Sequence, residues 1–330
     1  MKTYLGVDGG GSKTRFLLID EAGKVLGAHM EGSAYHLEIG IAALGAMLAR
    51  GIERTLKQAG IASAQVSFAF LGLPAYGEDR VLQQQLDAAP AAALPAGRYR
   101  CGNDMVCGWA GALAGTDGIN IVAGTGSIAY GEYGGRSARA GGWGELFSDE
   151  GSAYWLAREG LRLFSRMSDG RSARGPLHEM LRRHFALEDD LDLCAAIYGK
   201  SISQRSQLAQ LSRLVADAAA AGDAAARSLF TQAASELADI VDAVHDRLQV
   251  PAHVDLPVSY SGGLFQLRPL LLAPFESALL ARGRRYRLAA ARLPPDAGAA
   301  VYASKLAGAP LAGRSIAALE EQLTTSVPAD

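Results

Sequence analysis

The chain has 330 residues, of which 49% are hydrophobic and 20% charged, and its formal net charge is −2. This length exceeds what one hydrophobic core usually serves, so we expect two domains. The charge balance gives no basic footprint for nucleic acid, and charged residues interrupt each apolar run before the roughly 20 residues that a bilayer requires. No signal-peptide pattern is present at the start. We therefore expect a cytoplasmic protein with neither nucleic acid nor a membrane as a partner.

The first predicted elements form a β-hairpin with a glycine-rich tip. An apolar run ends at Asp8, and residues 14–20 read as the return strand. The turn between them comprises Gly9, Gly10, Gly11, Ser12 and Lys13. Glycines lack a Cβ atom where backbone N–H groups must approach an anion, and the serine hydroxyl adds a donor. No helix follows, which distinguishes this turn from a Walker loop and from a dinucleotide fingerprint.

The elements up to residue 115 predict one α/β domain. A third strand over residues 25–30 completes an antiparallel meander, and apolar residues at helical spacing predict a helix that Gly60 ends. The later elements are expected to alternate, with strands over 66–72 and 99–102 and helices over 81–86 and 105–115. This order predicts a mixed sheet with helical crossovers, assigned to residues 1–115.

A second glycine-rich hairpin opens the expected second domain, residues 116–330. Its turn comprises Gly124, Thr125, Gly126 and Ser127, and a return strand follows over 128–133. A single such turn is equally well explained as an ordinary hairpin. Two copies favour a nucleotide whose phosphates are held by both turns, and they suggest an ancient duplication.

The rest of the second domain is predicted to be mainly helical, with two further strands. The expected helices cover residues 152–166, 176–185, 204–220, 224–247, 267–280 and 296–306. The expected strands cover 254–261 and 286–291, and the last twenty or so residues are expected to be frayed.

Two carboxylates have positions that suit chemistry. Asp8 adjoins the first turn, where a carboxylate would repel phosphate unless a cation lay between them, so it is a candidate Mg²⁺ ligand. The alternative is a carboxylate that caps its own turn. Asp104 follows a strand at the sheet edge where ligands of α/β sheets gather, and it could accept a proton from a hydroxyl. It could equally be the N-cap of the next helix.

Two further segments have compositions typical of ligand sites. Residues 141–155 combine several glycines with carboxylates and an aromatic ring, which suits a sugar, although an acidic helix N-terminus is the alternative for its carboxylates. Gly262 and Gly263 end a strand, where a flat adenine could pass over bare backbone. A plain strand-to-helix turn explains these two glycines as well.

Together these segments resemble the N-acetylglucosamine kinase and BadF/BadG/BcrA ATPase family of the sugar kinase, heat-shock-protein and actin superfamily. The resemblance implies two actin-like lobes, each with a mixed sheet that opens in antiparallel hairpins, and an active site in the cleft between the lobes. It also implies that Ser12 and Thr125 contact ATP, that Asp104 is the general base, and that Gly262 and Gly263 lie at the adenosine. The implied sugar contacts are Gly142, Trp143, Gly144 and Asp149, together with Asp104.

Another part of the resemblance concerns Tyr35 and His36. Mammalian N-acetylglucosamine kinases are similar around these residues but carry a sugar-binding Asn where Tyr35 stands, so we expect this pair at the sugar. The iron–sulfur activators of the family use two cysteines per subunit, an arrangement that Cys101, Cys107 and Cys194 do not reproduce.

The function that follows is an ATP- and Mg²⁺-dependent amino-sugar kinase, most simply one that phosphorylates N-acetylglucosamine at its 6-hydroxyl. The alternatives are a glucosamine kinase and an ATPase that activates a reductase or dehydratase. The expected partners are small molecules, an amino sugar and ATP. A homodimer is left open.

Overall fold

The computed structural model describes residues 1–199 and 205–325, which form two compact units. Unit 1 comprises Met1–Asp117 together with Ala290–Asp330, and unit 2 comprises Gly118–Ala289. We had expected residues 116–330 to form one lobe. The end of the chain instead packs with the first unit, because a helix there covers the first sheet.

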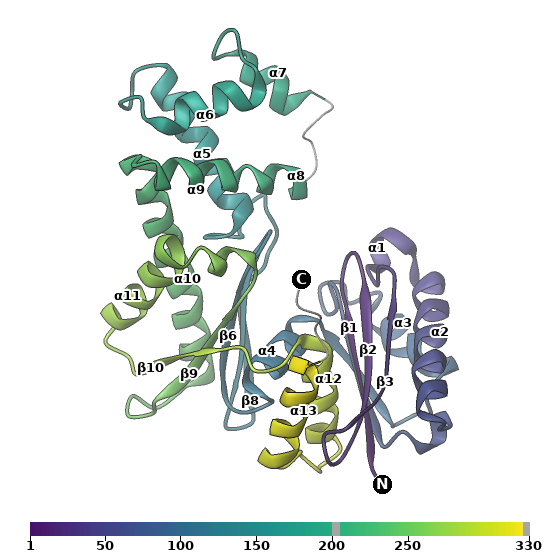
Figure 1. Cartoon of the computed structure of the whole chain (residues 1–330). Coiled ribbons are helices and arrows are strands. Elements are labelled where there is room, and N and C mark those ends of the chain that lie inside the picture. Colours follow the sequence, from purple (N-terminus) through teal and green to yellow (C-terminus); the bar gives the residue numbers. More distant parts are fainter. Residues whose placement is uncertain (200–204, 326–330) are drawn as a thin grey trace. The chain divides into compact units, whose positions relative to one another are not determined.

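Unit 1 contains a five-stranded mixed sheet in the order β3-β2-β1-β4-β5 (Figure 1). The first three strands are antiparallel, and β4 and β5 run parallel to β1. In this register Asp8 of β1 lies opposite Gly72 of β4, which in turn lies opposite Gly102 of β5. The strand bounds are β1 (Thr3–Gly9), β2 (Thr14–Asp20), β3 (Val25–Glu31), β4 (Phe68–Leu73) and β5 (Tyr99–Asn103).

Helices cover the sheet of unit 1, and the apolar side chains between them form its core. The helix α2 ends as predicted at Gly60, whose φ of 67° and N–H bonds to the carbonyls of Leu56 and Lys57 are those of a left-handed cap. The helix bounds are α1 (His36–Ile39), α2 (Ile41–Ala59), α3 (Gln83–Ala88), α4 (Met105–Leu113), α12 (Pro295–Leu306) and α13 (Gly313–Thr325).

Unit 2 repeats this topology. Its sheet has the order β10-β9-β6-β7-β8, again with three antiparallel strands and a parallel fourth strand. The two hairpins and the mixed sheets are therefore confirmed, and the matching strand order fits the inferred duplication. The strand bounds are β6 (Gly118–Ala123), β7 (Ser127–Tyr133), β8 (Arg136–Gly141), β9 (Leu256–Ser261) and β10 (Tyr286–Ala290).

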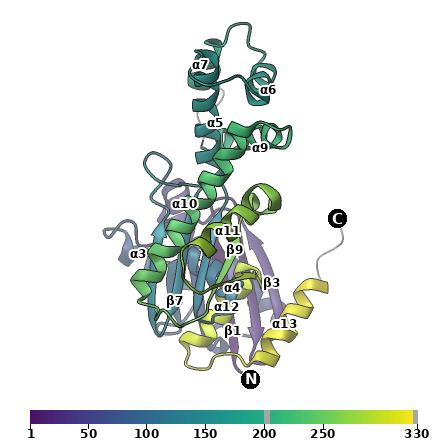
Figure 2. The same ribbon diagram turned by 90° about the vertical axis from the view of Figure 1, so that its left-hand side faces the viewer.

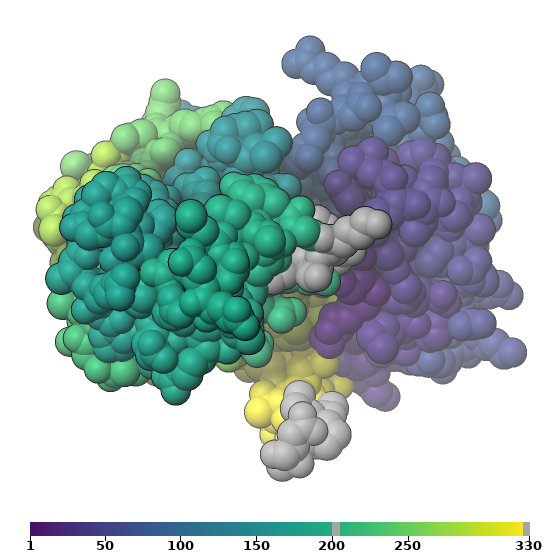
Figure 3. Space-filling view, turned by 90° about the horizontal axis from the view of Figure 1, so that it is seen from above, coloured from purple at the N-terminus to yellow at the C-terminus, as the bar shows by residue number. Residues whose placement is uncertain are grey.

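The long helix α10 lies along the sheet of unit 2, and further helices extend from one end of it (Figures 1 and 2). Its buried side chains contribute much of the core of the unit. The space-filling view shows the outer face of these helices (teal, Figure 3). The helix bounds are α5 (Ala153–Ser168), α6 (Pro176–Phe185), α7 (Asp192–Tyr198), α8 (Arg205–Gln210), α9 (Ser212–Ala220), α10 (Ala224–Leu248) and α11 (Ala273–Ala281).

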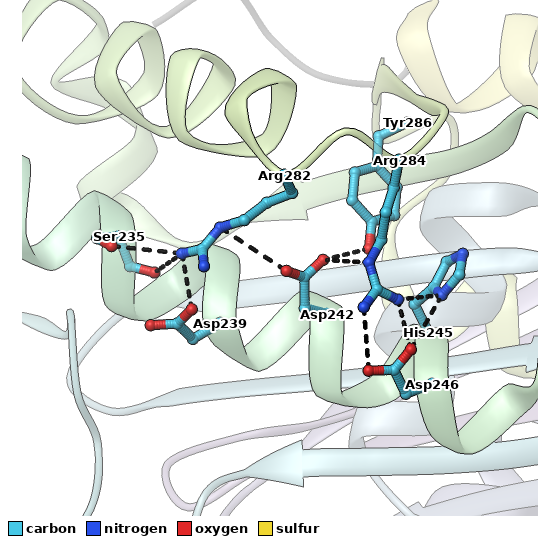
Figure 4. A network of polar contacts seen from close by, with 8 residues as sticks. All are labelled: Ser235, Asp239, Asp242, His245, Asp246, Arg282, Arg284 and Tyr286. Carbon is cyan, nitrogen blue, oxygen red and sulfur yellow. Dashed lines mark hydrogen bonds and ion pairs between the residues drawn. The ribbon is translucent and has the colours of Figure 1, made fainter. Parts of the chain in front are cut away.

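A polar network attaches the edge strand β10 to α10 (Figure 4). Asp242 accepts a hydrogen bond of 2.5 Å from the Tyr286 hydroxyl and lies 3.4 Å from Arg284 Nε, and Arg284 also pairs with Asp246 at 2.5 Å. Arg282 pairs with Asp239 at 2.7 Å. Each arginine therefore faces carboxylates on successive turns of one helix. This arrangement compensates charge where the chain enters β10.

Several elements differ from those expected. The strand β8 and the helix α7 were not anticipated, and α13 occupies a segment that we expected to be frayed. The helix expected over 204–220 is interrupted at Leu211 and divided into α8 and α9, and Gln204 lies outside the described residues. No helix in the described part of the chain is long and apolar enough to cross a membrane.

Glycines allow α12 to pack closely in unit 1. A Cβ atom on Gly298 would lie within the backbone of Gly111 in α4, and one on Gly6 would lie against Ala300. A Cβ atom on the half-buried Gly45 of α2 would meet its nearest neighbour, the Ala89 carbonyl oxygen, at an ordinary 3.5 Å. The contact between α12, α4 and β1 is therefore a backbone contact that no side chain can enter.

We predict that Gly298→Ala destabilises the protein, because α12 must shift to accept the methyl group, at a cost of about 1–3 kcal/mol. Gly45→Ala is the matched control and should be neutral or stabilising, since alanine favours a helix interior by about 1 kcal/mol. Urea denaturation midpoints of both variants test this. Equal midpoints would contradict the close-packing argument.

Candidate active site

The first glycine turn closes tightly at the edge of unit 1. Gly10 N donates to Lys13 O at 3.0 Å, and a Cβ atom on Gly9 would lie 2.7 Å from the Gly72 carbonyl oxygen. Gly11, Ser12 and Lys13 form an exposed tip. The turn therefore presents bare backbone and one hydroxyl to solvent, as a phosphate site requires.

Three carboxylates gather beside this turn. Asp8 comes from β1, Asp104 follows β5, and Asp296 lies in the first turn of α12. Burial raises the pKa of Asp8 to about 7, reinforced by repulsion from Asp104 and Asp296 and opposed by Arg15 and Lys13. Burial also raises the pKa of Asp296, whose buried Oδ1 has no hydrogen-bond partner among the described residues. The three carboxylates therefore concentrate negative charge that Arg15 and Lys13 offset only in part.

Asp104 does not act as the helix cap that was the alternative for it. Its side chain makes no capping hydrogen bond to α4, and the Met105 N–H donates instead to Asn103 Oδ1 at 3.1 Å. Burial raises the pKa of Asp104 to about 6, with the Met105 backbone lowering it and the negative charge of Glu78 raising it. The carboxylate is thus left available for a ligand.

Tyr35 and His36 lie close to the first turn. The preceding residue, Ala34, donates its N–H to Gly10 O at 3.0 Å, so the start of α1 is tied to the turn. His36 is 4% exposed, and its buried Nδ1 has no partner. Tyr35 is half-buried and its ring meets that of His36 edge-on. Unit 1 therefore brings together the predicted residues Asp8, Asp104 and this pair.

These carboxylates suit a hydrated cation, which needs few protein ligands, better than a cation that is bound by protein side chains alone. Among the described residues, no group of three or more His, Cys, Asp or Glu side chains is arranged to hold a metal ion by itself. Mg²⁺ usually keeps several waters and binds through one or two carboxylates and the substrate's phosphates. Asp8 and the unpartnered Asp296 Oδ1 suit that mode, since a nearby cation would offset their repulsion.

The second turn, in unit 2, is fastened to the segment that follows Ser148. Ala153 N donates to Gly124 O at 2.9 Å, and Ser127 Oγ donates to Glu150 O at 2.6 Å. Thr125 is exposed at the tip, whereas Ser127 is 2% exposed. The hydroxyl of Thr125 can thus meet a ligand, and that of Ser127 is used to hold the turn.

Asp149 is held directly against this turn. It is 1% exposed, has a φ of 62°, and its Oδ1 accepts a hydrogen bond of 3.2 Å from Ser127 N. Its other oxygen pairs with Arg205 of α8. A left-handed backbone is uncommon for a residue with a side chain, although aspartate tolerates it, so the position is closely constrained.

A pocket of about 730 Å³ adjoins the second turn. Gly124 and Thr125 form one wall, and Gly263 and Leu264, in the turn after β9, form another. Small residues contribute to the rest of the lining, including Ala153, Ala209 and Ala216. The polar members of the lining are Ser206, Gln210, Ser212, Arg213, Asp217 and Gln266. A pocket of this size that is lined by both apolar and polar residues suits a nucleoside.

The residues expected at a sugar are divided in unit 2. Trp143 is 67% exposed and lines a separate groove of about 520 Å³ with Phe147, Glu150 and Glu236, and Arg139 lies over its ring. Gly142 and Gly144 have φ values of 69° and 97°, which only glycine adopts readily. Asp149 lies on the turn instead and is not part of this groove.

Sequence reasoning missed Asp296, Arg205 and the α8–α9 face of the 730 Å³ pocket. Asp296 reads as a simple helix-start residue after two prolines, and the small residues that follow were the available signal of close packing. Arg205 and Asp149 are 56 residues apart in the sequence, and no local pattern links them.

Several known proteins are similar to this chain in sequence and in fold. The chain is 25% identical to an N-acetyl-D-glucosamine kinase of Dictyostelium discoideum, over 91% of this chain and 97% of that one. It is 30% identical to an N-acetylmuramic acid/N-acetylglucosamine kinase of Clostridium acetobutylicum, over 76% and 81% of the two chains. A crystal structure of a provisionally named N-acetylglucosamine kinase from Chromobacterium violaceum superposes with a TM-score of 0.68 at 28% identity, covering 91% of this chain and 98% of that one.

The fold is therefore the two-unit, actin-like fold of the sugar kinases. The model of the BadF/BadG/BcrA/BcrD ATPase family matches residues 5–303, and the chain belongs to that family.

Proposed function

We propose that the protein is an ATP-dependent amino-sugar kinase that transfers the γ-phosphoryl group to the 6-hydroxyl of N-acetylglucosamine. The observation that supports this best is Asp104, a carboxylate with a raised pKa that is free of capping duty and lies beside the first glycine turn. The similarity to two amino-sugar kinases supports the choice of acceptor.

Asp104 is the proposed general base. Its carboxylate accepts the proton of the sugar hydroxyl as the hydroxyl oxygen forms a bond to the γ-phosphorus. The bond from that phosphorus to the bridging oxygen breaks, and ADP leaves with the electron pair. Phosphoryl transfer needs little covalent help, so positioning and charge neutralisation supply most of the acceleration.

The two turns are the proposed phosphate contacts, through the backbone N–H groups of the glycines and the hydroxyls of Ser12 and Thr125. The turn at Gly262 and Gly263 is assigned to the adenosine side, and Gly263 lines the 730 Å³ pocket. Asp8 and Asp296 would hold hydrated Mg²⁺, which when bound neutralises phosphate charge.

The proposed sugar contacts are Tyr35 and His36 in unit 1 and Gly142, Trp143 and Gly144 in unit 2, whereas Asp149, which the resemblance also places at the sugar, is held at the second turn. The buried, unpartnered Nδ1 of His36 favours this role because a buried polar atom without a partner costs free energy that a ligand hydroxyl could recover. Trp143 offers an exposed ring against which a sugar face could pack.

A coupled assay with ATP, Mg²⁺ and a panel of sugars tests the function. We expect N-acetylglucosamine to give a higher kcat/KM than glucosamine or N-acetylmuramic acid, because two relatives are named as kinases of N-acetylglucosamine. Phosphorus NMR of the product should place the phosphate on the 6-oxygen. Hydrolysis of ATP at the same rate with and without sugar would instead favour an ATPase that acts on a partner.

We predict that Asp104→Asn lowers kcat by a factor of about 10²–10⁴ while both substrates still bind, because the amide keeps its size but cannot take the proton. Glu53→Gln, an exposed change on α2, is the charge-matched control and should leave kcat unchanged. Calorimetry supplies the binding constants. Near-normal turnover of a folded Asp104→Asn enzyme would assign the base to another residue.

The pH dependence of kcat/KM gives a further prediction. Asp104 must be deprotonated to act, and its pKa is raised to about 6, so activity should rise with pH through about 6. The negative charge of Glu78 raises that pKa, so Glu78→Gln should move the acid limb to lower pH. An acid limb that does not move in this variant would contradict the assignment of the limb to Asp104.

A further inference from the structure

A guanidinium group lies on the second glycine turn. Arg205, the first residue of α8, pairs with Asp149, and its Nε lies 3.4 Å from Glu145 Oε2. A Cβ atom on Gly126 would overlap the Arg205 Nη2 position and lie 2.7 Å from Asp149 Oδ1. Because Gly126 has no side chain, the Arg205–Asp149 ion pair can occupy the space where a Cβ atom would lie.

The ion pair reduces the repulsion that a buried carboxylate would exert on an anion bound at this turn. A turn that presents backbone N–H groups suits an anion, but a buried carboxylate at its side would repel phosphate. Asp149 is such a carboxylate, and Arg205 offsets its charge at the place where phosphates would arrive.

Arg205 also has hydrogen-bonding capacity to spare. A guanidinium has five N–H donors in a planar fork. In the described part of the chain, Asp149 and Glu145 are the contacts of this side chain, which remains 40% exposed. The two carboxylates approach Nη2 and Nε, and the fork can still donate to an incoming oxygen.

The position fits the phosphate end of the neighbouring pocket. Ser206, the next residue, lines the 730 Å³ pocket, as does Thr125, which precedes Gly126. Leu264 and Leu267 also line this pocket, and Arg205 lies at the turn. A nucleotide with its base in the pocket and its phosphates on the turn would bring its charge to this guanidinium.

We propose that Arg205 binds the β- and γ-phosphates of the nucleotide, and that Asp149 and Glu145 are positioning residues that hold its guanidinium over Gly126. This inference rests on the proposed ATP-dependent function. It assigns a phosphate-binding role to a residue outside the glycine turns.

Calorimetric affinities for ATP, ADP and AMP, measured on the full chain without sugar, test the proposal. Arg205→Gln should weaken ATP binding by about 10- to 100-fold, as expected for a lost charge-assisted contact, and ADP binding by less. AMP lacks the contacted phosphates, so its affinity should change by less than about twofold. Arg205→Lys keeps the charge without the fork and should give an intermediate loss for ATP.

Arg183→Gln on α6 is the matched control. It removes an equally charged side chain that is 70% exposed, and it should leave all three affinities unchanged. Thermal midpoints of each variant identify any loss of folding. If Arg205→Gln does not fold, the comparison of Arg205→Lys with the unaltered chain carries the test.

The outcomes separate this inference from the proposed function. Equal loss for ATP, ADP and AMP would show that Arg205 only supports the pocket, and no loss would show that it does not contact phosphate; either overturns the inference. An unaltered chain that binds none of the three nucleotides would overturn the proposed kinase function itself.

Discussion

The candidate site depends on how a buried carboxylate is compensated. In unit 2, Asp149 is paired with Arg205, and the pair fits into the space left by Gly126. In unit 1, burial raises the pKa values of Asp8 and Asp296, and the positive charge of Arg15 offsets this only in part. Burying an unpaired charge is costly, so it persists where a ligand can later compensate it. In unit 2, an arginine therefore offsets the charge of the carboxylate beside the glycine turn. In unit 1, the carboxylates retain an excess of negative charge that suits a cation.

The parts of the fold that the sequence predicted are those specified by local patterns. Both hairpins follow from apolar runs around glycines, and Gly60 ends its helix in the expected left-handed conformation. β8 was missed because Arg136–Gly141 alternates charged and small residues and has no apolar run. The segment Gly313–Thr325 contains few large apolar residues, but buried Ile316 and Leu319 hold it as a helix in unit 1. Both β8 and the helix Gly313–Thr325 are therefore stabilised by tertiary contacts that local sequence patterns do not indicate.

The residues of the candidate site likewise comprise some that local sequence patterns identify and some that they do not. Asp8 and Asp104 were identified because each directly follows or ends a strand, where position alone suggests a role. For Asp104 the structure adds that the Met105 N–H donates to Asn103 Oδ1, a contact that the sequence does not indicate, and the role of Asp104 as base stays a proposal. Arg205 and Asp296 reach their sites from distant parts of the chain, so only the folded arrangement reveals them.

The discontinuity of unit 1 has a consequence for the order of synthesis. β1 is made well before α12, which begins at Pro295, but Gly6 of β1 packs against α12. A ribosome releases residues in sequence, so this strand waits with one face uncovered until nearly the whole chain has emerged. Unit 2 is continuous from Gly118 to Ala289 and is fully available earlier. The unit that begins the chain is therefore the last that can be completed, which makes its exposed apolar strands the part most in need of protection during translation.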